Sequence, residues 1–109
     1  MTFSDAIQKA QSETATPGEL SEIRLWLAGR YAYQNGQLTQ ILIRKPELWN
    51  KIRYSGEVKS DTAAERFWSA TDDGKKETEL RHELKSIEKL LSATKTRIEI
   101  LLGESRLQL

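Results

Sequence analysis

Apolar residues recur along this chain at separations of three, four or seven positions, and no stretch alternates apolar and polar residues over the length of a strand. Residues three or four apart lie on one face of a helix, whereas the faces of a strand follow a period of two. The pattern therefore predicts an all-α protein. It indicates a short N-terminal helix followed by two long helical segments.

The first helix is predicted over residues 4–13, with Ser4 as its N-cap. Its apolar stripe is thin, since it consists of Ala6, Ile7 and Ala10 beside Phe3. A stripe this narrow buries little surface, so the helix is expected to depend on docking against the rest of the chain.

A long second helix is predicted over residues 17–54. Thr16, Pro17 and Glu19 form a complete start signal, with a threonine cap, a proline in the first turn and a glutamate three residues after the cap. Pro46 lacks a backbone donor, so the helix is expected to bend or break near it. The buried face is read from Leu20, Ile23, Leu27, Tyr31, Leu38, Ile41, Leu48 and Ile52.

The remaining helical segment is predicted over residues 61–102. Asp61 or Thr62 is expected to cap it, and a joint is expected near Gly74, where Thr71 or Asp72 can begin a new helix. The helix is expected to end after Leu102, with Gly103 as its C-terminal stop. Phe67 and Trp68 are expected to pack in the core against Trp49 and Ile52.

The last helix carries a heptad seam with one polar position, Thr94. Alternating spacings of four and three are typical of a coiled coil. The seam, expected to pack the core or join a second copy, is Leu80, Leu84, Ile87, Leu91, Ile98 and Leu101.

Together these elements predict one domain over residues 1–109, an antiparallel hairpin of long helices with the short N-terminal helix beside it. A hairpin covers each apolar stripe from one side only. Further apolar residues widen the stripes: Trp26, Leu42, Leu90, Ile100 and Leu102. We therefore expect a homodimer that completes a helical bundle.

Composition limits the chemistry. The 109 residues carry 17 basic and 16 acidic side chains and no cysteine, which leaves no strong overall field and excludes disulfides and thiolate sites. No apolar run is long enough for a membrane span, and the N-terminus does not resemble a signal peptide. A cytoplasmic protein without a membrane partner is expected.

Catalytic and metal sites find little support. His82 is the only histidine, and neither a phosphate loop nor a nucleophile elbow is present. Glu79 and His82 have the spacing of dimetal bundle sites, but the other inward positions are apolar. Asp72, Asp73 and Gly74 lack the alternating oxygen ligands of a calcium loop. We expect no enzyme activity, no metal and no cofactor.

A basic and aromatic segment over residues 44–59 is the candidate partner-binding surface. It combines five cations with two acids and two aromatic rings. Three interpretations remain open: a core tryptophan with solvating charges, a protein contact, or single-stranded nucleic acid held by phosphate contacts and stacking. The candidate residues are Arg44, Lys45, Trp49, Lys51, Arg53, Tyr54 and Lys59.

Residues 63–74, AAERFWSATDDG, and residues 80–98, LRHELKSIEKLLSATKTRI, resemble a pattern in short helical proteins of bacteriophages and prophages. The resemblance covers about residues 61–100 and implies an origin, with no established activity attached. If the origin is as the resemblance implies, the expected role is that of an inhibitor or adaptor of a host or phage protein complex, including an anti-defence role of the anti-CRISPR kind. The alternatives are an accessory protein of phage DNA metabolism that binds nucleic acid, or a small structural or assembly protein.

Overall fold

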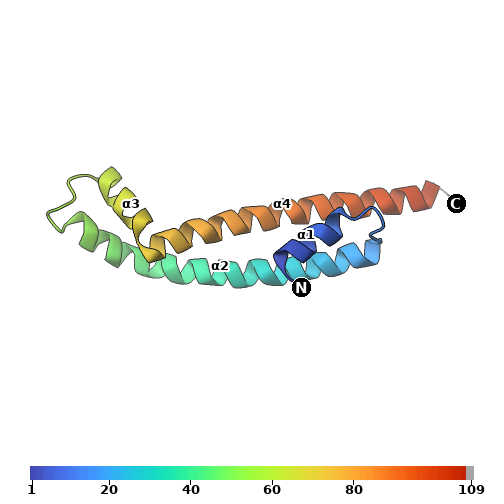
Figure 1. Cartoon of the computed structure of the whole chain (residues 1–109), viewed down its shortest axis with the longest axis horizontal. Coiled ribbons are helices and arrows are strands. Elements are labelled where there is room, and N and C mark those ends of the chain that lie inside the picture. Colours follow the sequence, from blue (N-terminus) through green and yellow to red (C-terminus); the bar gives the residue numbers. More distant parts are fainter. Residues whose placement is uncertain (108–109) are drawn as a thin grey trace. The chain divides into compact units, whose positions relative to one another are not determined.

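The computed structural model describes the backbone of residues 1–107 and the side chains of residues 1–104. Its four helices, in chain order, are α1 (Phe3–Gln11), α2 (Pro17–Arg53), α3 (Asp61–Ala70) and α4 (Asp72–Leu107) (Figure 1). The described residues contain no strand. The prediction of an all-α protein is therefore confirmed.

Helix α1 begins one residue earlier than predicted because Thr2, and not Ser4, is its N-cap. The Thr2 hydroxyl accepts a hydrogen bond from the Asp5 backbone N–H at 3.1 Å, and the Asp5 carboxylate accepts one from the Thr2 N–H at 3.0 Å. This reciprocal capping box satisfies two N–H groups that a helix start otherwise leaves unpaired. The hydrogen bond that the Thr2 N–H donates to the carboxylate is the main reason that the pKa of Asp5 is lowered.

Helix α2 starts as its sequence signal predicts and continues without a break through Pro46 to Arg53. The Thr16 hydroxyl accepts a hydrogen bond from the Glu19 N–H at 3.2 Å and donates to the Glu19 carboxylate at 3.1 Å. Pro46 removes one backbone donor, yet the helical turns on both sides hold the chain in register. Of the two alternatives at Pro46, a break into two helices is wrong.

The start of α3 and the end of α4 also differ from the sequence-based prediction. Ser60 caps α3, with its hydroxyl accepting from the Ala63 N–H at 3.1 Å, whereas Asp61 and Thr62 lie inside the helix. Helix α4 continues through Gly103 to Leu107. Glycine costs only about 1 kcal/mol in a helix interior relative to alanine, so by itself it does not end a helix.

The chain forms two compact units, each of which combines part of α2 with part of α4. Unit 1 consists of residues 1–32 and the portion of α4 from Lys85 onward, and unit 2 of residues 33–84. Unit 2 is continuous in sequence, whereas unit 1 combines two separate stretches of the chain. Within each unit the α2 and α4 segments pack together and run in opposite directions (Figure 1).

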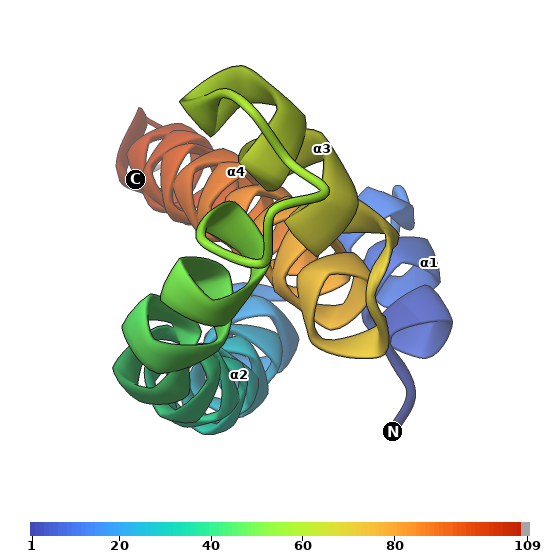
Figure 2. The same cartoon turned by 90° about the vertical axis from the view of Figure 1, so that its left-hand side faces the viewer.

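In unit 1, α1 lies against the α2 and α4 segments (Figures 1 and 2). Ala6 and Ala10 are its buried residues, and their small side chains allow a close approach. The Arg97 guanidinium donates hydrogen bonds to the carbonyl oxygens of Ala10 and Ser12, at the C-terminal end of α1. The buried core of this unit contains Ala6, Ala10, Ala15, Leu20, Ile23, Leu27 and Ile87.

The polar seam position Thr94 is also buried in unit 1, and its hydroxyl donates to the Leu90 carbonyl oxygen at 2.8 Å. A hydroxyl that bonds to its own helix backbone needs no partner across the core. The neighbouring seam residues Leu91, Ile98 and Leu101 are partly buried against the core. Their role in a dimer stays a prediction.

In unit 2, the buried apolar side chains come from three helices: Leu38, Ile41, Ala64, Trp68, Leu80 and Leu84. Full burial of a side chain of this size contributes about 1.5–3 kcal/mol relative to an exposed one. Two polar residues, Gln34 and Glu77, are buried with them. Figure 2 faces the connection between α2 and α3.

Among the described residues, no helix combines the length and the apolar character that crossing a bilayer requires.

Candidate partner-binding groove

Thr71 is the joint between α3 and α4, and it ends one helix while it begins the next. Its backbone N–H donates to the Trp68 carbonyl oxygen at 2.9 Å, and its hydroxyl donates to the same oxygen at 2.6 Å. The hydroxyl also accepts from the Gly74 N–H at 3.0 Å, as an N-cap does. The stretch of aromatic residues, aspartates and glycine at this point is therefore a helix joint, as the sequence favoured.

The joint places two adjacent aromatic residues in different environments. Trp68 is buried, with only 1% of its surface exposed, whereas Phe67 is 53% exposed. The prediction that Phe67 belongs to the core is wrong, because successive residues of a helix point about 100° apart and α3 buries only one face. An exposed phenylalanine beside a buried tryptophan marks the edge of a site.

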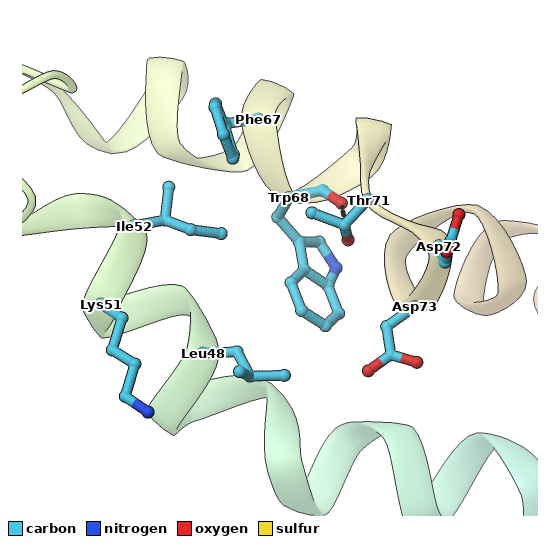
Figure 3. A pocket seen from close by; sticks show the side chains of 8 residues that line it. All are labelled: Leu48, Lys51, Ile52, Phe67, Trp68, Thr71, Asp72 and Asp73. Atoms are coloured by element: carbon cyan, nitrogen blue, oxygen red, sulfur yellow. Dashed lines mark hydrogen bonds between the residues drawn. The ribbon is translucent and has the colours of Figure 1, made fainter.

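A groove opens beside this pair, between the C-terminal part of α2 and α3 (Figure 3). Its main cavity has a volume of about 480 Å³. The apolar lining consists of Leu48, Ile52, Phe67 and Trp68, and the polar lining of Lys51, Thr71, Asp72 and Asp73. A second cavity of about 220 Å³ shares Lys51, Ile52 and Phe67 with the first and adds Ser55, Glu57 and Val58. We call the two together the α2–α3 groove.

The charges around the α2–α3 groove are only partly neutralised by the protein itself. The Arg44 guanidinium contacts both Asp73 oxygens, at 3.0 and 3.3 Å. Lys51 lies 3.5 Å from Glu47, with both side chains largely exposed. Asp72 and Glu57 have no ion-pair partner among the described residues. Unpaired carboxylates are therefore the charges that the groove presents to a ligand.

Behind the groove, Lys45 forms the centre of a network of ion pairs. Its ammonium lies 3.2 Å from Glu65 and 3.1 Å from the buried Glu77, and 5.5 Å from the centre of the Trp68 ring. The Glu77 oxygen lacks the alignment of a good hydrogen bond, so its contact with Lys45 is an ion pair. The Trp49 indole N–H donates to Glu65 at 2.8 Å.

Burial by itself lowers the pKa of Lys45, but the close contacts with Glu77 and Glu65 and the negative charges of these two carboxylates outweigh it. The pKa of Lys45 therefore lies above its ordinary value, and the ammonium stays charged under physiological conditions. Lys45 thus holds α2, α3 and α4 together within unit 2.

The basic and aromatic candidate residues are brought into one unit, but most of their charges are used internally. Arg53 donates to Asp61 at 2.8 Å, and Arg44, Lys45 and Lys51 have the partners described above. Tyr54 is 78% exposed, and Lys59 is exposed as well. Their role in partner binding stays a prediction, and the surface they form is less basic than the sequence alone indicates.

Sequence reasoning expected Trp68 to pack near the end of α2, but it did not find the α2–α3 groove. The available signal was the pair Phe67 and Trp68 in a short helix, since a short helix rarely has a face for both rings. His82 lies on an exposed position of α4, away from the groove-lining residues. Within the described part of the chain, no group of three or more histidine or acidic side chains could hold a metal ion.

Comparison of the chain with family models, with curated proteins and with solved structures gives no match. The geometry and the charges of the groove are therefore the features of the molecule that bear on its function.

Proposed function

We propose that this protein is a non-enzymatic interaction protein of the phage type, which acts as an inhibitor or adaptor of a host or phage protein complex. The α2–α3 groove is its binding site for that protein partner. The role fits an anti-defence protein, including one of the anti-CRISPR kind. The observation that carries the proposal is the apolar cavity beside the half-exposed Phe67.

An apolar cavity bordered by an exposed aromatic ring favours the binding of a bulky side chain. Water in contact with Leu48, Ile52 and Phe67 is released when such a side chain enters, and the released area contributes roughly 25 cal/mol per Å². Binding energy in protein interfaces concentrates at aromatic anchors of this type. A volume of about 480 Å³ is also within the usual range of ligand-binding clefts.

The mechanism that follows is steric. The Lys45 network and the Thr71 joint fix the walls of the groove, so little conformational freedom is lost when a partner binds. The bound protein keeps its segment in the groove and cannot offer the same segment to its own complex. In an adaptor, the remaining helix faces stay available for a second protein.

The test is affinity capture from a bacterial lysate with three versions of the chain, followed by mass spectrometry. Phe67→Glu places a charge at the mouth of the groove, and Ile43→Glu makes the same change at a 75% exposed residue of α2 that does not line it. We expect one abundant protein with the wild type and with Ile43→Glu, and its loss with Phe67→Glu. Circular dichroism checks that the variants retain their helices.

Two outcomes contradict the proposal. If the same proteins are captured by all three versions, the groove is not the binding site. If the wild type captures no protein above an unrelated helical control, the interaction function itself is wrong.

A nucleic-acid accessory function is the second candidate. It is favoured by the exposed Tyr54, whose ring lies 5.5 Å from the Arg53 guanidinium, and by the exposed Lys59 in the same segment. Stacking rings beside cations suit single-stranded nucleic acid. A mobility-shift assay over a range of salt concentrations tests it. Binding that falls steeply with salt, and disappears when Arg44, Lys51 and Arg53 are replaced by glutamine, would favour this function over the first.

The proposal includes self-association as a homodimer. In unit 1, Leu25 is 77% exposed, Ile100 55% and Leu102 44%. Exposed apolar side chains of this size on long helices favour burial against a second copy. Light scattering at micromolar concentration is expected to give twice the mass of one chain, and Ile100→Glu to give a monomer. A wild-type monomer at this concentration would contradict the dimer.

A further inference from the structure

We infer that the partner segment bound in the α2–α3 groove is basic and amphipathic, with a bulky apolar side chain flanked by lysine or arginine. The apolar side chain enters the cavity beside Phe67 and Trp68, and the flanking cations meet Asp72 and Glu57. This inference depends on the proposed function and specifies the chemistry of the partner.

The charges on the rim of the groove determine which sign of charge the partner segment carries. The rim of the groove holds three carboxylates, Asp72, Asp73 and Glu57, and one ammonium, Lys51. Asp73 makes a two-point contact with Arg44, and Lys51 lies 3.5 Å from Glu47. The two carboxylates that remain unpaired therefore give the rim a negative surplus, which attracts cations and repels acidic segments.

Asp72 is the first residue of α4. It is also exposed and lines the main cavity. A cation of the partner can therefore reach it without displacing an existing ion pair of the protein.

Trp68 supplies an independent observation that the site lacks a partner. Its indole nitrogen is buried and has no hydrogen-bond acceptor among the described residues. In Figure 3 the indole lies among the cavity-lining side chains, with its nitrogen on the edge toward Thr71 and Asp73. A buried donor without an acceptor is costly, so an oxygen of the bound segment at this edge is favoured.

The Trp68 indole is enclosed by its neighbours, and one of them is Lys45, whose ammonium lies over the ring. Because the indole nitrogen is buried, the bound segment reaches it only after a small displacement of the neighbouring side chains. Binding is therefore expected to shift the indole N–H resonance strongly.

The sign of the partner's charge differs from what residues 44–59 indicate by themselves. That segment is basic in sequence, which suits an acidic protein surface or nucleic acid. In the folded unit 2, its cations Arg44, Lys45 and Arg53 pair with acids of α3 and α4. The carboxylates left over at the groove reverse the preference.

The experiment uses two six-residue peptides, acetylated and amidated, that share leucine and tryptophan and differ in carrying two lysines or two glutamates. Each is titrated into the isotope-labelled full-length protein, and the backbone and indole N–H resonances are followed by NMR. We expect the lysine peptide to shift the Trp68 indole and the Ile52 and Phe67 amides. We expect the glutamate peptide to bind at least about tenfold more weakly, which corresponds to one or more ion pairs at a partly exposed site.

Asp72→Asn combined with Glu57→Gln should weaken binding of the lysine peptide about fivefold or more and abolish the preference between the peptides. The matched control is Glu79→Gln, which removes a carboxylate from an exposed position of α4 that does not line the groove. It should leave both affinities unchanged. Salt should weaken the lysine peptide in the wild type and much less in the double variant.

The inference is overturned if the glutamate peptide binds as tightly as the lysine peptide, or if neither peptide moves the Trp68 indole resonance. Its failure can be distinguished from failure of the proposed function. Lysate capture that depends on Phe67, together with a preference for glutamate, keeps the groove and refutes the basic partner. Capture that does not depend on Phe67 refutes the groove as the binding site, whatever the peptides do.

Discussion

A Cβ atom at Gly74 would lie 1.9 Å from the carbonyl oxygen of Trp68. Real Cβ atoms do not approach a backbone oxygen this closely, so the first turn of α4 can lie against the last turn of α3 only because residue 74 has no side chain. The contact fixes the joint that forms one wall of the groove.

Gly74→Ala should therefore destabilise the protein, by at least about 1–3 kcal/mol, because the backbone of the joint must move to admit the methyl group. Urea unfolding followed by circular dichroism measures the change. Gly36→Ala is the matched control in the same unit, since a Cβ there meets nothing within 4 Å. It should stabilise the protein by about 0.5–1 kcal/mol through helix propensity. Equal effects of the two substitutions would contradict the close approach.

Lys45→Met should destabilise unit 2 by about 2 kcal/mol, because it leaves the buried Glu77 carboxylate with only its 3.5 Å contact to the half-exposed Arg81. The double variant Lys45→Met with Glu77→Leu removes the carboxylate as well and should recover most of the loss. Unfolding free energies of the single and double variants give the coupling. Additive losses would show that the ion pair contributes nothing to stability.

The ion pair of Lys45 with Glu77 also predicts that the free energy of unfolding changes with pH in the alkaline range. The folded-state pKa of Lys45 is raised, so its stabilising contribution is fully present below the unfolded pKa of about 10.4 and is lost as the pH rises through the higher folded value. The stability difference between wild type and Lys45→Met should thus be constant from pH 7 to 9 and shrink above about pH 10.5. Urea midpoints of both proteins across this range measure it, and a difference that grows with pH would contradict it.

Arg97→Ala should loosen α1, because the guanidinium satisfies the carbonyl oxygens of Ala10 and Ser12. A nine-residue helix is marginal by itself, so loss of these contacts should raise hydrogen exchange in α1 about tenfold or more. Lys95→Ala, at an exposed position of α4 close to Arg97 in sequence, is the control. Unchanged protection of α1 in the Arg97 variant would show that its buried alanines are sufficient for docking.

Much of the helical architecture was readable from the sequence because its signals are local. Thr16 and Glu19 start α2 as their spacing indicates, and the stripe from Leu20 to Ile41 lies buried except for the partly buried Tyr31. The ends were less readable. Ser60 caps α3 in place of Asp61, and Gly103 does not stop α4, because neighbouring residues compete for a cap and packing outweighs a weak helix breaker.

The candidate site was readable only in part. Arg44, Trp49 and Arg53 were singled out as charged or aromatic residues in one segment, but each of them contacts an acid of another helix. Those partners, Asp73, Glu65 and Asp61, could not be assigned from spacing. The groove beside Phe67 was not anticipated, since it depends on how α3 lies against α2.

The sequence by itself determined that this chain is helical and which faces of its long helices avoid water, because helix period and capping act between residues a few positions apart. Only the tertiary structure decided that Trp68 is buried while Phe67 is half exposed, and which cations are neutralised. Burial and ion pairing depend on neighbours brought from other helices. The charge that remains at the groove is therefore a property of the folded unit and not of any one segment.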